Sequence, residues 1–114
     1  MELQRWEEAG LTVLEVRGNV KVGESSQQFA SELQDILDTT QTGVLIDVSN
    51  IDYVDSTGIG ELVGYLLKFS QAKRRLALFR PQDRLVSLLK LTRLESHFPI
   101  FEDREHALIF VSQG

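Results

Sequence analysis

Four consecutive residues, Asp55-Ser56-Thr57-Gly58, have the types and spacing in this chain best suited to a chemical role. They combine a carboxylate, two hydroxyls and a glycine, and the apolar periodicity that follows predicts a helix. The backbone N–H groups at the start of a helix point outward and favour an anion. A phosphate on Ser56 would be accommodated there, and it would add roughly −1.5 to −2 charges at pH 7. If a partner docks on the same surface, one phosphate would switch binding off.

The same spacing also fits a purely structural role. Ser56 or Thr57 would then cap the helix through its hydroxyl, a contact that stabilises a helix by about 1 kcal/mol. Spacing alone favours this interpretation, because Ser and Thr caps are common. A third interpretation, a hydrolase using Ser56, is disfavoured because a nucleophilic serine needs an adjacent base. The two histidines, His97 and His106, lie near the C-terminus, and no G-x-S-x-G motif is present.

Cofactor and metal sites are not indicated by the remaining residues. Gly58-Ile59-Gly60 has neither the length nor the lysine of a phosphate-binding loop, and nothing of ligand type is spaced with the histidines. The chain has no cysteine, which excludes disulfides, thiolate nucleophiles and cysteine zinc sites. We therefore expect no catalysis, cofactor or metal. The basic run Lys73-Arg74-Arg75 could form a basic face with Arg80, Arg84, Lys90 and Arg93, but we interpret these residues as a solvated surface.

Composition predicts one folded domain. The chain has 114 residues, of which 42% are hydrophobic and 25% are charged, ordinary values for a folded domain. Its net charge of −5 argues against nucleic-acid binding and suits contact with basic protein surfaces. No apolar run approaches the roughly 20 residues of a membrane-spanning helix, and the N-terminus lacks an apolar signal core. We expect a single cytoplasmic domain over residues 1–114 without a membrane span.

Strands and helices alternate along the chain and would position the Asp55–Gly58 turn. Apolar patterns predict five strands, at residues 3–6, 11–16, 44–48, 76–79 and 100–101. Four helices are expected: one opened by a capping box of Ser25 and Gln28, one after Asp55, one from Pro81 and one capped by Asp103. The order ββαβαβαβα predicts an α/β fold with a mixed, mostly parallel sheet that begins with a hairpin.

Two finer expectations concern the ends and faces of these elements. Gly18 is expected to end the second strand. In the second helix, Gly60 and Gly64 are four residues apart and predict a face small enough for close packing. The buried stripe of that helix is expected to contain Ile59, Leu62, Val63, Leu66 and Leu67.

Taken together, these residues resemble the STAS domain family, found in bacterial anti-sigma factor antagonists. The matching pattern runs from the strand at 44–48 through Ile51 to the stretch 53–60, which contains the Asp-Ser-Thr-Gly motif. It continues through 88–94 and 98–103, followed by Ala107-Leu108. The resemblance covers essentially the whole chain, and the motif is its most specific part.

The resemblance implies a STAS fold with helices packed mainly on one face of the sheet, and no catalysis by the domain itself. In the family, the serine after the aspartate is phosphorylated by a partner serine kinase that is itself the anti-sigma factor. That position is Ser56 here, and Thr57 is the less favoured acceptor. The unphosphorylated form binds the kinase and frees a sigma factor; a phosphatase restores it after phosphorylation. Asp55 is expected to shape the loop, and Gly58 to let the kinase approach closely.

One stretch, Gly18-Asn19-Val20-Lys21, departs from the family pattern, which commonly has acidic residues where this chain has Asn19 and Lys21. We expect both to border the acceptor loop and to share its partner-binding surface. Lys21 would pair with a phosphate on Ser56 or accept a more acidic partner, unless the change is drift at an exposed turn. The departure motivates an alternative function, a STAS interaction module that works without phosphorylation in a transport or other signalling complex. The sequence predicts neither the oligomeric state nor the pathway.

Overall fold

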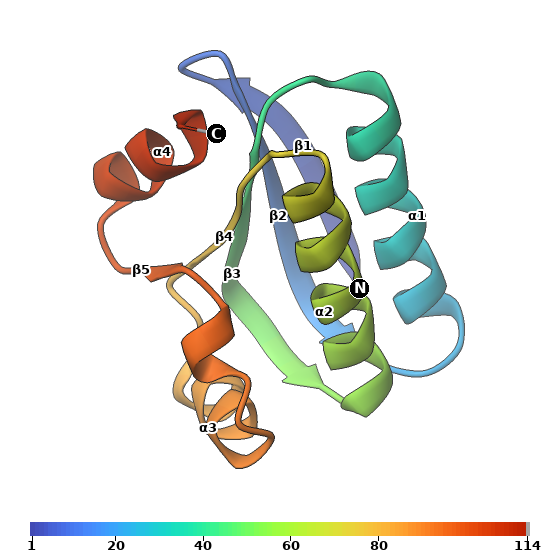
Figure 1. Ribbon diagram of the computed structural model, residues 1–114. Helices are drawn as coiled ribbons and strands as arrows, with labels where there is room; N and C mark the ends of the chain where they lie inside the picture. The colour runs from blue at the N-terminus through green and yellow to red at the C-terminus, as the bar shows by residue number, and fades with distance from the viewer. Residues whose placement is uncertain (114) are drawn as a thin grey trace.

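A five-stranded mixed sheet and four α-helices make up residues 1–113, the part of the chain that this computed structural model describes (Figure 1). The strands are β1 (Glu2–Glu8), β2 (Leu11–Val20), β3 (Val44–Val54), β4 (Leu76–Phe79) and β5 (Ile100–Phe101). The helices are α1 (Glu24–Thr39), α2 (Ser56–Gln71), α3 (Asp83–Leu91) and α4 (Arg104–Ser112), with a short 3-10 turn at Glu95–His97. The sheet order is β1-β2-β3-β4-β5; β1 and β2 are antiparallel and the other neighbours are parallel. The predicted fold class and element order are confirmed.

Hydrophobic clusters cover both faces of the sheet. The larger cluster lies under α1, α2 and α3, and the smaller one lies under α4 on the opposite face (Figure 1). Strand β3 supplies both clusters, because successive side chains point to opposite faces: Ile46 belongs to the larger and Leu45 to the smaller. This explains why residues 44–48 read as a nearly continuous apolar run. The helices lie mainly on one face, as expected, and α4 is the exception.

The predicted beginning of α1 is wrong. The helix starts at Glu24, and its N-cap is Gly23, with no side-chain capping bond. Ser25 faces the preceding loop instead: its Oγ accepts from the Lys21 N–H at 2.9 Å and donates to the Lys21 carbonyl at 3.0 Å. The expected end of the second strand is also wrong, since β2 continues past Gly18 to Val20. Gly18 has a φ of +92° and lies beside a register shift, which a glycine accommodates easily.

The faces of α2 differ in part from the predicted pattern. Ile59 and Leu62 are buried as expected, whereas Leu67 is 56% exposed. Gly60 and Gly64 make no close packing within residues 1–113, because a Cβ at either position would meet nothing within 4 Å. The side of α2 that carries these glycines is therefore unpartnered in this part of the chain.

Arg74, in the basic run after α2, has a structural role and is not simply solvated. Arg74 donates to the carbonyls of Thr42 and Leu37 at 2.7 and 2.8 Å, close to the end of α1. The helix expected from Pro81 begins two residues later, at Asp83. The last helix is capped by Asp103, as predicted, through a bond from the His106 N–H.

No helix within residues 1–113 is both long and apolar enough to cross a membrane.

Candidate functional site

The Asp55–Gly58 turn lies where β3 ends and α2 begins, beside the loop that joins β2 to α1. Parallel pairing of β2 with β3 creates this neighbourhood, because it places Asn19 opposite Tyr53 and Val20 opposite Val54. The Asp55 N–H then donates to the Val20 carbonyl at 3.1 Å. The two stretches that the sequence predicts to share a surface, 18–21 and 55–58, are therefore adjacent.

Strand β3 reaches the site through two irregularities in its pairing with β2. The stretch from Asp47 to Asn50 pairs with Glu15–Arg17 of β2, so β3 contains one extra residue there. A second extra residue, Asp52, lies between the partners of Gly18 and Asn19. Extra residues of this kind bend a strand and re-aim its side chains. One result is that Asp52 and the following Tyr53 are both exposed beside the turn.

Asp55 organises the turn with both oxygens of its carboxylate. Its Oδ1 accepts from the Gly58 N–H at 2.9 Å, which makes Asp55 the N-cap of α2. Its Oδ2 accepts from the Val22 N–H at 2.8 Å and so ties in the loop between β2 and α1. The Gly58 and Val22 N–H groups, in that order, lower the pKa of Asp55, because they stabilise the charged form. The prediction that Ser56 or Thr57 caps the helix is wrong.

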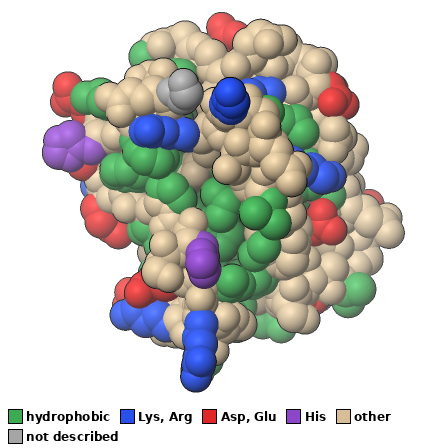
Figure 2. Space-filling view, viewed as in Figure 1, with side chains coloured by type: hydrophobic (Ala, Val, Ile, Leu, Met, Phe, Trp, Pro, Cys, Tyr) green, Lys and Arg blue, Asp and Glu red, His purple; other side chains and the backbone are tan. Residues whose placement is uncertain are grey.

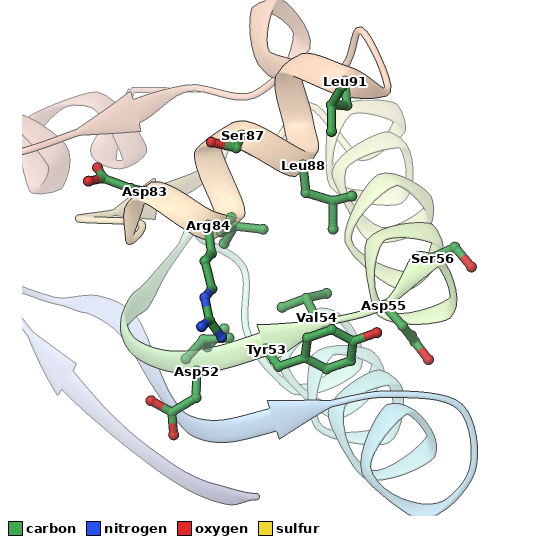
Figure 3. A pocket seen from close by; sticks show the side chains of 12 residues that line it. Asp52, Tyr53, Val54, Asp55, Ser56, Asp83, Arg84, Ser87, Leu88 and Leu91 are labelled. Atoms are coloured by element: carbon green, nitrogen blue, oxygen red, sulfur yellow. The ribbon is translucent and has the colours of Figure 1, made fainter.

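Because Asp55 caps the helix, the Ser56 hydroxyl is not needed as a cap. Ser56 is the first residue of α2 and is exposed, whereas Thr57 is half-buried. Within residues 1–113 the Ser56 hydroxyl makes no hydrogen bond, and Figure 3 shows it pointing outward from the first turn of α2. Neither histidine reaches it: His97 and His106 lie in the 3-10 turn and in α4. The site therefore presents an unassisted, accessible hydroxyl at the positive end of a helix dipole.

Gly58 serves the protein's own packing. A Cβ at this position would lie 2.7 Å from Val54 Cγ1 and 2.9 Å from the Val20 carbonyl oxygen. The glycine lets the first turn of α2 approach the ends of β2 and β3. Residues of this chain fill the space that the missing Cβ leaves, so a close approach of a kinase to Gly58 stays a prediction for the other side of the backbone.

Asn19 and Lys21 are exposed on the neighbouring loop. Ser25 holds the Lys21 backbone at both its N–H and its carbonyl. The Lys21 ammonium forms no salt bridge with any acidic group of residues 1–113, so it presents an unpaired charge on the loop next to Ser56.

Apolar side chains are exposed around the same turn. Val22 is 72% exposed, Tyr53 49% and Leu91 82%. A groove of about 630 Å³ runs between β3, the start of α2 and α3 (Figure 3). In the view of Figure 2, hydrophobic side chains gather in the middle of the face, with charged side chains around the margin. Exposed apolar groups with a polar margin are typical of protein-docking surfaces.

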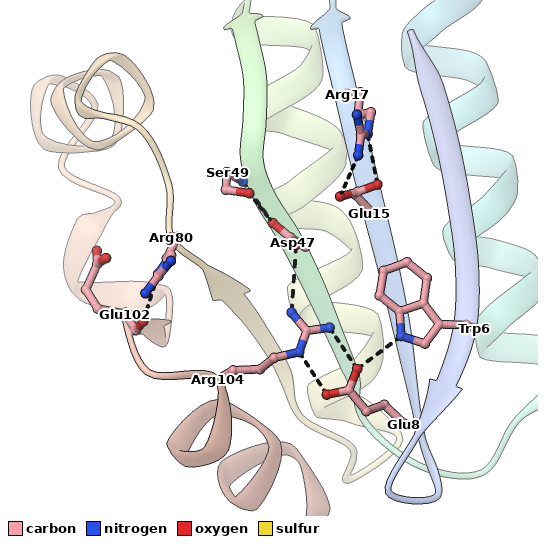
Figure 4. A network of polar contacts seen from close by, with 9 residues as sticks. All are labelled: Trp6, Glu8, Glu15, Arg17, Asp47, Ser49, Arg80, Glu102 and Arg104. Atoms are coloured by element: carbon pink, nitrogen blue, oxygen red, sulfur yellow. Dashed lines mark hydrogen bonds and ion pairs between the residues drawn. The ribbon is translucent and has the colours of Figure 1, made fainter.

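A second group of charged residues lies on the α4 side of the sheet, and sequence reasoning missed it (Figure 4). Arg104 Nε and Nη2 donate to the two carboxylate oxygens of Glu8 at 2.8 and 2.9 Å. Arg104 Nη1 lies 3.8 Å from Asp47, whose Oδ1 also accepts from the Ser49 hydroxyl. The bond from Arg104, and then one from the Trp6 Nε1–H, lower the pKa of Glu8 to about 2. These partners are 96 residues apart, so no local spacing signals the pair.

Comparison with known proteins identifies the family of this chain. A family model described as the STAS domain matches residues 3–107. An anti-sigma-B factor antagonist of Listeria monocytogenes is 34% identical over 76 residues, which cover 63% of this chain and 67% of that protein.

Two solved structures share the fold. One, described as a proposed anti-sigma factor antagonist from Thermotoga maritima, has a TM-score of 0.87 and 20% identity, over 96% of this chain and 93% of that one. The other is the Bacillus cell fate determinant SpoIIAA in its phosphorylated form, with a TM-score of 0.73 and 15% identity, over 96% and 99% of the two chains. With the family match over nearly the whole length, these findings show that the chain belongs to the STAS domain family.

Proposed function

We propose that this chain is a partner switch of the anti-sigma factor antagonist kind, controlled by phosphorylation of Ser56. The unphosphorylated form binds an anti-sigma factor with serine kinase activity and frees a sigma factor. Transfer of a phosphoryl group to Ser56 Oγ ends that binding, and a phosphatase restores it. The observation that carries the proposal is the exposed Ser56 hydroxyl, which has no bond within residues 1–113 because Asp55 caps the helix.

The surroundings of Ser56 support a modification that changes the surface without unfolding the domain. The hydroxyl lies at the N-terminus of α2, where the helix dipole favours an anion. The unpaired ammonium of Lys21 is on the adjacent loop. A phosphate would therefore be tolerated in the free protein. At a docked interface it would be desolvated or repelled, and that cost would release the partner.

The exposed side of α2 supports a docked partner on the same surface. Ser56, Gly60 and Gly64 are spaced by four residues, so they lie along one face of the helix. A glycine inside a helix costs roughly 0.5–1 kcal/mol relative to alanine. No atom within 4 Å in residues 1–113 requires either glycine to lack a Cβ. A partner that packs closely against α2 would make use of the space that they leave.

The proposal is tested by measuring binding of the anti-sigma factor from the same organism to three forms of the protein. The native chain and Ser56→Ala are expected to bind, whereas Ser56→Asp is expected to lose binding. Incubation with the kinase and a nucleoside triphosphate should place one phosphate on Ser56, located by mass spectrometry. Thr57→Ala is the matched control and should still be phosphorylated. Equal binding by Ser56→Asp and the native chain would contradict the switch.

A second candidate is a STAS interaction module that works without phosphorylation in a transport or other signalling complex. The unpaired Lys21 favours it, because the loop then presents a cation where the family commonly has an acidic residue. In this case the protein should co-purify with constitutive partners, and Ser56→Asp should leave the complex intact. Lys21→Glu should weaken it. Loss of the complex in Ser56→Asp would favour the switch instead.

A further inference from the structure

The second half of β3 has a free edge. Strand β4 pairs only with Val44–Asp47, so from Val48 to Val54 no strand within residues 1–113 lies on that side of β3. After β4 the chain turns away, and the Gln82 Nε2–H donates to the Ser49 carbonyl at 2.7 Å. This side chain covers only the start of the free edge. A strand edge without a neighbour presents backbone N–H and carbonyl groups that are ready to pair with another chain.

The groove beside Ser56 follows this edge. It is lined by Ile51, Asp52, Tyr53 and Val54, which border it in succession because the extra residue at Asp52 breaks the side-chain alternation of β3. Its opposite wall is α3, from which Arg84 reaches toward Asp52 (Figure 3). Since β4 ends at Phe79, α3 stands beside the place where a neighbouring strand would otherwise continue.

The lining of the groove defines what would fit. Leu88 and Leu91 from α3 and Tyr53 from β3 provide apolar contacts, and Leu91 is 82% exposed without an occupant. The charged lining residues are three carboxylates and one guanidinium: Asp52, Asp55, Asp83 and Arg84. An occupant with apolar side chains and positive charge would complement both features. The groove has a volume of about 630 Å³, which is within the usual range of binding pockets, about 300–1,000 Å³.

We propose that the free edge of β3 is a binding site where an extended segment of a partner protein adds a strand between β3 and α3. Backbone hydrogen bonds to β3 supply the affinity, as in other cases of strand addition. Alternate apolar side chains of the segment contact Leu88 and Leu91, and a Lys or Arg of the segment pairs with Asp52. This site goes beyond the proposed switch, because it does not depend on phosphorylation of Ser56.

The test uses a displayed library of random linear peptides, selected on the native chain and counter-selected on Leu91→Glu. We expect enriched peptides in which apolar residues alternate with Lys or Arg. In amide NMR spectra they should shift the signals of Ile51–Val54 and α3. Leu91→Glu should lower the affinity for these peptides on the order of tenfold, because it replaces one apolar contact by a charge. The matched control is Leu67→Glu, which changes an exposed leucine of α2 outside the groove and should leave binding unchanged.

Two further experiments, one on the peptide and one on the protein, distinguish strand addition from other modes of binding. N-methylation at alternate residues of a selected peptide should abolish binding, while N-methylation at the intervening residues should not, because only every second N–H of an added strand faces β3. Asp52→Lys should shift the selected sequences away from Lys and Arg. The proposal is overturned if no peptide is enriched over the counter-selection, if the peptides shift signals elsewhere, or if selected peptides have helical periodicity. The peptides are selected on the unphosphorylated chain with no kinase present, so failure of the switch would not be mistaken for failure of this site.

Discussion

The molecule has two polar regions that use their charges in opposite ways. On the α4 side, Arg104 binds Glu8 through two bonds and lies near Asp47, which also accepts from Ser49, so these charges have partners inside the chain (Figure 4). At the end of β3, the hydroxyl of Ser56 and the ammonium of Lys21 have no partner in residues 1–113. Arg104 and Glu8 are half-buried and Asp47 is buried, and polar groups shielded from water are normally paired inside the protein. The contrast indicates that the first region holds the fold together and that the second is available to a partner.

Both regions contain a carboxylate with a lowered pKa, but the causes differ. The pKa of Glu8 is lowered to about 2, chiefly by the bond from Arg104, whereas the pKa of Asp55 is lowered chiefly by the N–H groups of Gly58 and Val22. The first carboxylate neutralises a cation. The second accepts from backbone N–H groups without a counter-ion, and so it orders the turn that presents Ser56.

The largest expected effect tests whether the turn at the end of β3 is tightly packed. Gly58→Ala should destabilise the fold by about 1–3 kcal/mol, because the added Cβ would overlap Val54 Cγ1 and the Val20 carbonyl. Chemical denaturation monitored by circular dichroism measures it. Gly60→Ala, where the Cβ meets open space, is the matched control. If the two variants were equally stable, the tight packing of the turn would be contradicted.

The next effect tests the role of Asp55 as the organiser of the turn. Asp55→Ala should lower the free energy of unfolding by about 1 kcal/mol through loss of the N-cap. Amide exchange at Gly58 and Val22 should also become faster, because both N–H groups lose their acceptor. Asp55→Asn keeps one carbonyl acceptor and should fall between Ala and the native chain. Unchanged exchange at Val22 would show that the carboxylate does not tie the two loops together.

A smaller change in stability, of opposite sign, tests whether a partner docks on the glycine-bearing face of α2. Gly60→Ala and Gly64→Ala should each raise the free energy of unfolding by roughly 0.5–1 kcal/mol, because alanine is the better helix former and the added Cβ meets nothing. The same variants should weaken partner binding in a titration. Greater stability with undiminished binding would mean that the partner does not use this face.

The smallest expected effect concerns the acid titration of Glu8, on the α4 side of the sheet. A lowered pKa in the folded state means that Glu8 contributes stability above its unfolded pKa, near 4.5, and loses that contribution as the pH falls toward about 2. The difference in unfolding free energy between the native chain and Glu8→Gln should therefore be constant near neutral pH and shrink between these two values. Glu7→Gln is the control, since Glu7 forms no salt bridge within residues 1–113. A pH-independent difference would rule out the titration of Glu8 as its cause.

Much of this architecture was predictable because its signals are local. Alternation and helical spacing marked each strand and helix, and Asp103 was recognisable as the cap of the last helix. The errors arose where distant contacts compete with local ones. The hydroxyls of Ser25 and Ser56 both looked like helix caps, but Ser25 binds the backbone of Lys21, and Asp55 replaces Ser56 as the cap. Leu67 fitted the apolar stripe of its helix, yet no neighbouring element covers it.

The order of the elements, the mostly parallel sheet and the hydroxyl at the start of α2 could be predicted from neighbouring residues, because apolar periodicity is a local signal. Contacts between groups far apart in the chain became visible in the fold alone. Val22 reaches Asp55, 33 residues away, because β2 and β3 pair in one particular register. Glu8 meets Arg104 because α4 returns to the first hairpin, and β3 has a free edge because β4 ends at Phe79. Pairing between distant segments depends on register and packing, which local spacing does not encode.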